Sequence, residues 1–555
     1  MPVKLAARLA LLTRITSSVI VVAALLVSSR GPALADSLSF GSFGGAQYAT
    51  STGTGTNSNA TIRQSQTDVE AAAGEVAHKK KMRSLFPDPI VSEQPMPPVI
   101  PQLQNDGGPG GMIATFQPTG ATQTANNAFF QNLGSNGRTC FTCHQPQDGW
   151  TLSAPHARER FDADPNDPLF RRVDGATCPS ADVSTLDAKR SAYSLLTKKG
   201  LFRIGLPMQS TMEFELLDVT DPYGCNTSPI TGLTGSKSGI VSVYRRPLPT
   251  ANLGFLSTIM WDGREPDLFH QSIDATLGHA QADMAPTATQ QQQIVTFEGC
   301  TTANNPGLCA NTPKGAGIFT AQIYDTSAGP LSAARASGGP VELAANVASF
   351  FLGINDPLGL NPTGAAFSPV VFDLYDAWAD LGGQGSAIAA RSAIARGQQV
   401  FNSVPINITG VDGLNDLLNL PSIAGFCGTC HDTPGAGNHS VKAPLNIGIA
   451  NAGKQSPPAL DISGLPIFTL WCTSGPLAGK TFQVTDIGRA MISGNCADIG
   501  KLKGPILRGL AARAPYFHNG SAATMSDVVE FYDQRFGIGL SAQQKADLVA
   551  FLNAL

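Results

Sequence analysis

The sequence predicts a mainly α-helical fold with two similarly built domains, long coil insertions and few short strands. A five-residue motif, Cys-x-x-Cys-His, occurs twice, and each copy follows a stretch with helical spacing of apolar residues. Strand-like alternation is short and rare, as in 240–244. The 58 glycines and 39 prolines indicate long coil around a modest helical framework.

The N-terminus, residues 1–35, is predicted to be a Sec signal peptide. Basic residues precede the apolar run 19–27, and Ala33-Leu34-Ala35 offers a small-x-small cleavage site. An uncleaved anchor is the alternative, but the run is shorter than the roughly 20 residues that span a bilayer. We therefore expect an exported, periplasmic protein without a membrane span.

Residues 36–120 are predicted to form an irregular arm, because Ser, Thr, Gly, Gln and Pro dominate them. The basic run 78–81 within this arm is expected to be solvated. Four of the 37 basic residues lie in the signal peptide, so 33 remain against 41 acidic residues. This balance favours a cationic partner and gives no indication of nucleic acid.

Helical patterns support two domains. Residues 125–133 and 393–401 have helical spacing ahead of the first and second motif, and Ser541 can cap a closing helix that ends at Leu555. Residues 341–352 are the expected counterpart of that closing helix in the first unit. The repeated setting indicates a duplicated unit.

The boundary between the units is placed in the Gly-rich stretch 382–386. The domains are then 121–384 and 385–555.

The two motifs, Cys140-Phe141-Thr142-Cys143-His144 and Cys427-Gly428-Thr429-Cys430-His431, predict covalent attachment of haem c. Two thiols three residues apart can bond the two vinyl groups of one haem, and the adjacent histidine then ligates the iron. A zinc knuckle or a thioredoxin-like pair needs a second ligand pair or a βαβ context that the sequence lacks. We therefore predict two covalently bound haems c.

The other axial ligand decides whether a haem only transfers electrons or also binds peroxide or dioxygen. Methionines, tyrosines and six histidines outside the motifs are candidates, and composition does not choose among them. These histidines are His78, His156, His270, His279, His439 and His518.

Six cysteines lie outside the motifs. In an oxidising compartment they could form three disulfides between neighbours in the sequence, and free buried thiols are the alternative. The neighbours are Cys178/Cys225, Cys300/Cys309 and Cys472/Cys496.

Two further segments, Met260-Trp261-Asp262-Gly263-Arg264 and Ala514-Pro515-Tyr516-Phe517-His518-Asn519-Gly520-Ser521, resemble motifs of the di-haem cytochrome c peroxidase and MauG family. The order of the four motifs is also that of the family, and the resemblance covers roughly residues 120–555, with long insertions. It implies a first haem that reacts with peroxide, a second haem that stores electrons, and Trp261 as the relay between them.

The resemblance also implies roles for other residues of the first unit. Gln271 matches the family glutamine near the relay, and His518 of the second segment is counted with the catalytic residues. A Glu-Met pair normally follows the glutamine. The nearest match is Asp283-Met284, two residues further along, with Gln281 at the ungapped position. Asp283 is therefore the candidate proton carrier, and His279 is the alternative.

At the second haem, the peroxidases use a methionine fourteen residues after the histidine of the second segment. Tyr532 stands there in this chain, as a tyrosine does in MauG. An oxygen ligand favours ferric iron and lowers the potential. Tyr532 is thus the candidate iron ligand, with a buried helix residue as the alternative. Met525 occupies an apolar helix position and is expected to be core.

Two further family features are in doubt here. The calcium site of the family uses an asparagine fifteen residues before the relay tryptophan, and Arg246 stands there, so calcium is possible but doubtful. His156 is a candidate displaceable ligand of the first haem, but its spacing from His144 is shorter than in resting peroxidases.

The resemblance implies periplasmic reduction of hydrogen peroxide at the His144 haem. Electrons would come from a small donor protein, such as a c-type cytochrome or a cupredoxin, through the His431 haem and Trp261. A MauG-like oxidase acting on a protein or organic substrate is the first alternative, which Tyr532 favours. A non-catalytic electron-transfer cytochrome is the second.

Overall fold

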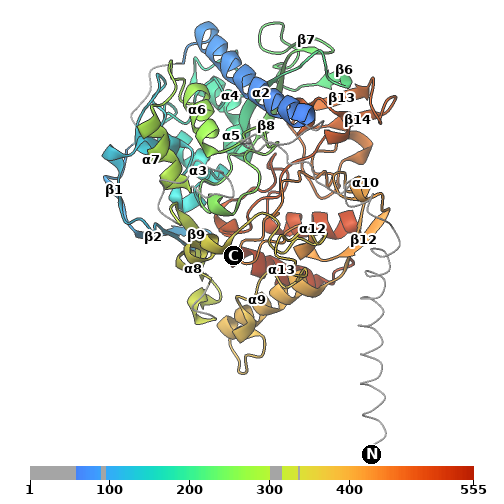
Figure 1. The fold of residues 1–555 in the computed structure, drawn as a ribbon. Helices are drawn as coiled ribbons and strands as arrows, with labels where there is room; N and C mark the ends of the chain where they lie inside the picture. Colours follow the sequence, from blue (N-terminus) through green and yellow to red (C-terminus); the bar gives the residue numbers. More distant parts are fainter. Residues whose placement is uncertain (1–57, 89–94, 300–314, 335–337) are drawn as a thin grey trace, which may run out of the picture.

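The computed structural model describes residues 58–88, 95–299, 315–334 and 338–555 (Figure 1). The predicted signal peptide and the Cys300/Cys309 pair lie outside these residues. None of the helices in the described ranges combines the length and the hydropathy needed to cross a membrane.

The helices of the described residues are mostly short. They are α2 (Ser58–Leu85), α3 (Ala154–Ala163), α4 (Leu186–Ala192), α5 (Ser194–Lys199), α6 (Leu268–Gly278), α7 (Ala288–Glu298), α8 (Pro340–Asn346), α9 (Ser386–Ser403), α10 (Asn415–Leu418), α11 (Ala490–Ser493), α12 (Met525–Phe536) and α13 (Ala542–Asn553).

The predicted mainly α fold with few strands is wrong, because the described residues contain fourteen strands in five antiparallel sheets. The sheets are β1–β4 (Val99–Ile100, Thr122–Gln123); β10–β9–β3–β2 (Gly329–Pro330, Phe319–Asp325, Gly111–Phe116, Leu103–Gly108); β11–β12 (Ile406–Thr409, Ser422–Gly425); β14–β13–β6 (Thr481–Val484, Ile467–Cys472, Phe214–Thr220); and β5–β8–β7 (Phe202–Pro207, Ser238–Arg245, Leu233–Gly235).

Several strands could not be predicted from the local sequence pattern, and the reason is physical. Five consecutive residues of β5, Phe202–Leu206, are buried, so it lacks the alternation of a half-buried strand. Strand β6 pairs with β13, which follows some 250 residues later, as Phe214 opposite Cys472 illustrates. Long-range pairing of this kind leaves no local signature.

The prediction that residues 36–120 form an irregular arm also needs correction. It contains the helix α2 and the hairpin of β2 and β3, whose turn ends at Gly111 with a φ of 121°. Within α2, His78 and Lys79 are buried, against the expected solvated run. The helix is polar overall, but it packs against α6, β5 and α11, and its buried Glu75 pairs with Lys79 of the same helix and with Arg264.

The helix predictions have mixed outcomes. Residues 393–401 lie within α9, and Ser541 caps α13 by accepting a hydrogen bond from the amide of Gln544, so both predictions are confirmed. Residues 125–133 form only short 3₁₀ turns, and 341–352 begins as α8 but leaves the helix at Asn346.

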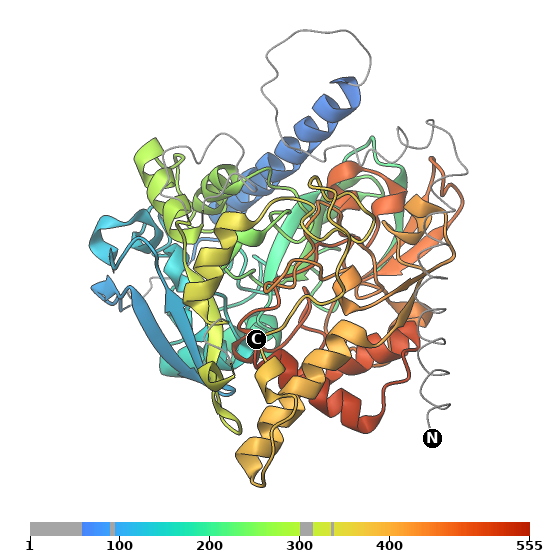
Figure 2. The same ribbon diagram turned by 60° about the horizontal axis from the view of Figure 1, so that its bottom comes forward.

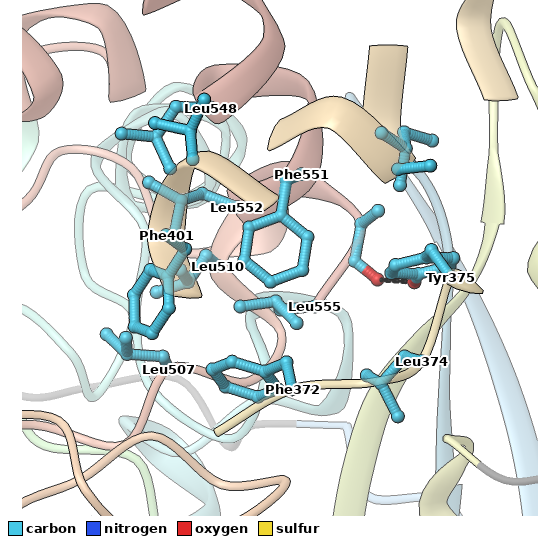
Figure 3. Close-up of a cluster of buried hydrophobic side chains, with 14 of the residues drawn as sticks. Phe372, Leu374, Tyr375, Phe401, Leu507, Leu510, Leu548, Phe551, Leu552 and Leu555 are labelled. Atoms are coloured by element: carbon cyan, nitrogen blue, oxygen red, sulfur yellow. Dashed lines mark hydrogen bonds between the residues drawn. The ribbon is translucent and has the colours of Figure 1, made fainter. Parts of the chain in front are cut away.

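The helices α9 and α13 pack together and form the core of the C-terminal half (Figures 1 and 2). Figure 3 shows the ring of Phe551 at its centre. That ring lies 5.5 Å from the ring of Phe372 and 5.8 Å from that of Phe401. Burial of such aromatic pairs fixes the segment that precedes the second Cys-x-x-Cys-His motif.

Two predicted disulfides are confirmed. Cys178 bonds Cys225 in the first half, and Cys472 at the end of β13 bonds Cys496 after α11. The four cysteines of the two motifs take part in no disulfide.

Candidate functional site

The two Cys-x-x-Cys-His motifs adopt the same local structure. Each begins with a 3₁₀ turn, over Cys140–Thr142 and Cys427–Thr429. In each, the histidine amide donates to the carbonyl of the first cysteine at 3.1 Å. The threonine hydroxyl of each motif accepts from the backbone amide of the residue that precedes the motif. This equivalence agrees with a duplicated unit.

Both motif histidines are held in one tautomer. The Nδ1 of His144 lies 3.0 Å from the carbonyl oxygen of Trp150, and the Nδ1 of His431 lies 2.8 Å from that of Gly437. Each carbonyl belongs to the sixth residue after the histidine. A carbonyl only accepts, so Nδ1 carries the proton and Nε2 keeps its lone pair for a metal. Burial lowers the pKa of His144 to about 4 and also lowers that of His431.

Each motif opens into its own cavity. The first cavity, of about 170 Å³, is lined by Cys140, Cys143 and His144, and the second, of about 230 Å³, by Cys427, Cys430 and His431. Two free thiols and one neutral imidazole in a mainly apolar cavity are the groups that attach and ligate a haem c. The residues present therefore fit one covalently bound haem in each cavity.

Trp261 and the segment 246–249 line both cavities. The indole N–H of Trp261 donates to the carbonyl of Arg246 at 2.8 Å, and its ring lies 6.1 Å from that of His518. The tryptophan thus lies in the wall between the two cavities, within reach of both.

One face of α6 covers part of the first cavity. Leu268, Gln271, Ala275 and His279 follow the helical spacing of three or four residues and line the cavity. The Asp267 side chain accepts from the backbone amide of His270 and begins the helix there. Gln271 therefore lines the first cavity, as Trp261 does.

Asp283, the candidate proton carrier, does not reach the first cavity. Its side chain is 83% exposed and pairs with the Arg83 guanidinium at 3.2 Å. Gln281 has a φ of 58°, so the chain leaves the direction of α6 at this turn and carries Asp283 to the surface. The Gln281 side chain donates to the carbonyl of Lys79 and does not line the cavity either.

His279, the residue that caps the C-terminal end of α6, is the titratable side chain that this helix brings to the first cavity. Its Nδ1 lies 2.7 Å from a carboxylate oxygen of Asp174, and Lys79 Nζ lies 3.3 and 3.4 Å from its two ring nitrogens. Burial lowers the pKa of His279, Lys79 lowers it further, and Asp174 acts in the opposite direction. A neutral imidazole with Nδ1–H on Asp174 leaves Nε2 as the proton acceptor.

Glu298 was missed by the sequence analysis. It ends α7, is 4% exposed and lines the first cavity, and its Oε2 has no hydrogen-bond partner among the described residues. Burial raises its pKa to about 8, so the carboxyl is largely protonated at neutral pH. The only signal in the sequence is an acid that follows the apolar residues Ile294, Val295 and Phe297.

Tyr532 and Met525 both line the second cavity from α12. The Tyr532 ring lies 6.5 Å from the His431 ring, and burial raises the pKa of its phenol. Met525 is 4% exposed and also packs in the core with Val529 and Leu548. Both side chains therefore line the second cavity, and the ring of Tyr532 also lies beside that of the motif histidine.

Two other candidates lie off the cavities. His518 is fully buried next to Trp261, 3.6 Å from the Asp486 carboxylate, and burial lowers its pKa to about 4. His156 lies 2.7 Å from the Asp148 carboxylate and is not among the residues that line the first cavity. The structure therefore does not bring His156 to the first haem position.

Comparisons with known proteins give partial matches. No family model matches the chain. The cytochrome-c peroxidase IdrP2 of Denitromonas iodatirespirans is 36% identical over 140 residues, which is 24% of this chain and 36% of that protein. The cytochrome-c peroxidase IdrP1 of Pseudomonas sp. (strain SCT) is 40% identical over 81 residues, 13% of this chain and 21% of that protein. The matches thus span about a third of these relatives or less.

Among solved structures, one described as a MauG-like protein associated with microbial copper homeostasis aligns with a TM-score of 0.31 and 17% identity. The alignment covers 78% of this chain and 87% of that chain.

Proposed function

We propose that this chain, which is related in sequence to cytochrome-c peroxidases, is a di-haem peroxidase-like oxidoreductase that reduces hydrogen peroxide. The observation that carries the proposal is the pair of cavities, each with two thiols and a neutral histidine, that share Trp261 in their common wall. The reaction combines one hydrogen peroxide with two electrons and two protons and yields two waters.

Cys140 and Cys143 would hold one haem and Cys427 and Cys430 the other, through thioether bonds. His144 and His431 would each offer Nε2 to the iron, because Nδ1 is bound to a backbone carbonyl. When bound, the first haem would supply peroxide binding and the second would supply electron storage.

The proton path of the proposed reaction starts at His279. Its Nε2 would take a proton from the bound substrate and return it to the departing oxygen. Asp174 fixes the ring through Nδ1, and the Lys79 ammonium keeps the imidazole neutral before the reaction. Asp174 is itself paired with Arg138, so the carboxylate stays ionised and does not compete for the proton.

The electron path runs through the wall. An indole can be oxidised at a lower potential than an aliphatic side chain, so Trp261 would shorten the gap between the two haems. The electrons would come from a small redox protein in the periplasm, for which the acidic net charge of the chain favours a cationic docking face.

A MauG-like oxidase is the second candidate. The specific observation is that Tyr532, and not only Met525, lines the second cavity next to His431. A phenolate ligand would lower the potential of the second haem and favour oxidising a protein or organic substrate over storing electrons.

Purified holoprotein tests the proposal. Acid-acetone extraction followed by mass spectrometry should leave both haems on the chain. After partial reduction, the first haem should bind cyanide or carbon monoxide, and a reduced small c-type cytochrome should be oxidised by peroxide at two equivalents per peroxide. Two haems that stay inert to these ligands in every redox state would instead make the chain an electron-transfer cytochrome.

A further inference from the structure

The wall between the two cavities carries three buried cations. Arg246, Lys503 and Arg513 all line the second cavity, and Arg246 also lines the first. Arg246 and Lys503 are each 6% exposed and Arg513 is 8% exposed, so each is removed from bulk water. No aspartate or glutamate is among the described residues that line the second cavity. We call these three side chains the wall cations.

The wall cations are tied to the relay tryptophan through the backbone. The carbonyl of Arg246 accepts from the indole of Trp261 at 2.8 Å, and the amide of Lys503 donates to the carbonyl of Trp261 at 2.9 Å. The cluster therefore has a fixed position in the wall, between the two Cys-x-x-Cys-His motifs.

Their hydrogen bonds go to neutral groups. Arg246 donates to the carbonyls of Leu152, at 2.7 Å, and of Arg513, while Arg513 donates to that of Ile506 at 2.8 Å. The Nε of both arginines lacks a partner, and no ion pair within 4.0 Å joins a wall cation to a carboxylate among the described residues. Asp148 acts on Arg246 only through space and is itself bonded to His156.

Such a cluster is unfavourable without an anion. Burial and the neighbouring Arg513 together lower the pKa of Lys503 to about 7, and they lower that of Arg246 to about 10. By contrast, Arg245, one residue before Arg246, is equally buried and is held by the carboxylates of Asp486 and Asp262. Buried charges require such a counter-charge, which none of the described residues supplies to the wall cations.

We propose that the wall cations bind the propionate carboxylates of the bound haems, Lys503 and Arg513 those of the second haem and Arg246 bridging both. The inference rests on the proposed two-haem function. A haem attached through its vinyl groups carries its two carboxylates on the opposite edge of the ring, away from the thioether bonds. Arginine binds a carboxylate with two parallel N–H groups, and a lysine adds a point charge.

This arrangement has a consequence for the second haem. Three cations hold the carboxylates ionised, and they disfavour the extra positive charge of ferric iron. The potential of the second haem should therefore be high for its ligands and insensitive to pH near neutrality. The other titratable groups that line the same cavity are His439, Tyr516 and Tyr532, beside the motif residues Cys427, Cys430 and His431.

The test is a redox titration of the holoprotein, followed by absorbance, from about pH 5 to pH 8, the range in which only histidine normally titrates. Lys503→Met should lower the reduction equilibrium constant of the second haem about tenfold, which is about 59 mV for one electron. It should also raise the pKa of a haem propionate, so that its ionisation falls within the pH range of the titration. Arg513→Gln should act in the same direction, and Lys503→Arg should keep the wild-type behaviour.

Lys501→Met is the matched control, because Lys501 pairs with Asp498 at 3.1 Å and lines neither cavity. An equal shift in this variant, or none in Lys503→Met and Arg513→Gln, would overturn the proposal. If neither cavity variant matures, the wild-type titration decides, since an ionisation in this range that survives His439→Asn also contradicts it. Mass spectrometry of the attached haems separates these outcomes from a failure of the two-haem function.

Discussion

The indole nitrogen of Trp261 and the carbonyl oxygen of Arg246 are joined by a 2.8 Å hydrogen bond, and both residues line both cavities. This bond fixes the plane of the indole between the two cavities. It also ties the relay candidate to a buried cation, so changes at either residue are felt at both cavities.

Replacing Trp261 with phenylalanine should slow peroxide turnover more than about tenfold, or about 1.4 kcal/mol in the barrier. Phenylalanine keeps most of the packing but is far harder to oxidise, and it cannot donate to Arg246. Cyanide binding at the first haem, measured by absorbance, should stay near that of the wild type. Trp471→Phe, on an exposed part of β13, is the control. Unchanged turnover in Trp261→Phe would remove the residue from the electron path.

His279→Gln should reduce peroxide turnover by roughly 10²- to 10⁴-fold, the range for loss of a positioned acid–base group. Asp283→Asn should leave turnover near wild type, because this side chain is at the surface and paired with Arg83. Steady-state assays on the two variants discriminate directly between the sequence-based and the structure-based proton carrier. The reverse pattern would return the role to Asp283.

The pH profile of turnover should depend on Lys79. Burial and Lys79 lower the pKa of His279, so the neutral imidazole persists below the ordinary histidine pKa and activity falls only in more acidic buffer. Lys79→Met removes one lowering influence and should move the acidic limb of the profile to higher pH. A limb that stays in place or moves to lower pH would exclude His279 as the group that titrates.

Glu298 should make the protein less stable as the pH rises. Burial raises its pKa from 4.5 to about 8, so between these values the unfolded chain is ionised while the folded carboxyl keeps its proton. The free energy of unfolding should therefore fall across this window, by about 1.4 kcal/mol for each unit of pKa difference as an upper bound. Thermal melts of Glu298→Gln should lack this slope, whereas those of the exposed Glu159→Gln should keep it.

Tyr532 and Met525 can be separated by spectroscopy. If the phenolate ligates the second haem, the resting protein should lack the far-red band of a methionine-ligated ferric haem. Tyr532→Met should then raise the potential, because a thioether stabilises ferrous iron relative to an oxygen donor. Met525→Leu should leave the spectrum unchanged. A spectrum that responds to Met525→Leu and not to Tyr532→Phe would support peroxidase-type ligation and weaken the oxidase alternative.

The parts of the site that lie within a short stretch of sequence could be predicted from it. Each attachment motif lies within five residues, and the spacing from Trp261 to Gln271 spans one turn and the first part of α6, so their positions follow from short-range structure. Asp283 lies at the surface because a single left-handed residue, Gln281, redirects the chain. That conformation is set by packing against α2, which the composition of the arm concealed.

The remaining site residues come from distant segments. Lys79 reaches His279 from 200 positions earlier, and Arg513 meets Arg246 from 267 positions later. Glu298 belongs to a helix outside every motif. The sheets could not be predicted from the sequence for the same reason, since β6 and β13 pair only when both halves are folded. Side chains that meet only through tertiary contacts have no characteristic spacing in the sequence, so their contact could not be predicted from it.

The pairing of β6 with β13 means that the first half of the chain cannot complete its sheets before the C-terminal part is present. A nascent chain that has not yet delivered residue 467 leaves β6 with a free backbone edge in the otherwise formed first half. Such high contact order slows folding, and an exposed edge invites association with other chains. A chain truncated before β13 should therefore aggregate through this edge rather than fold as a stable first half.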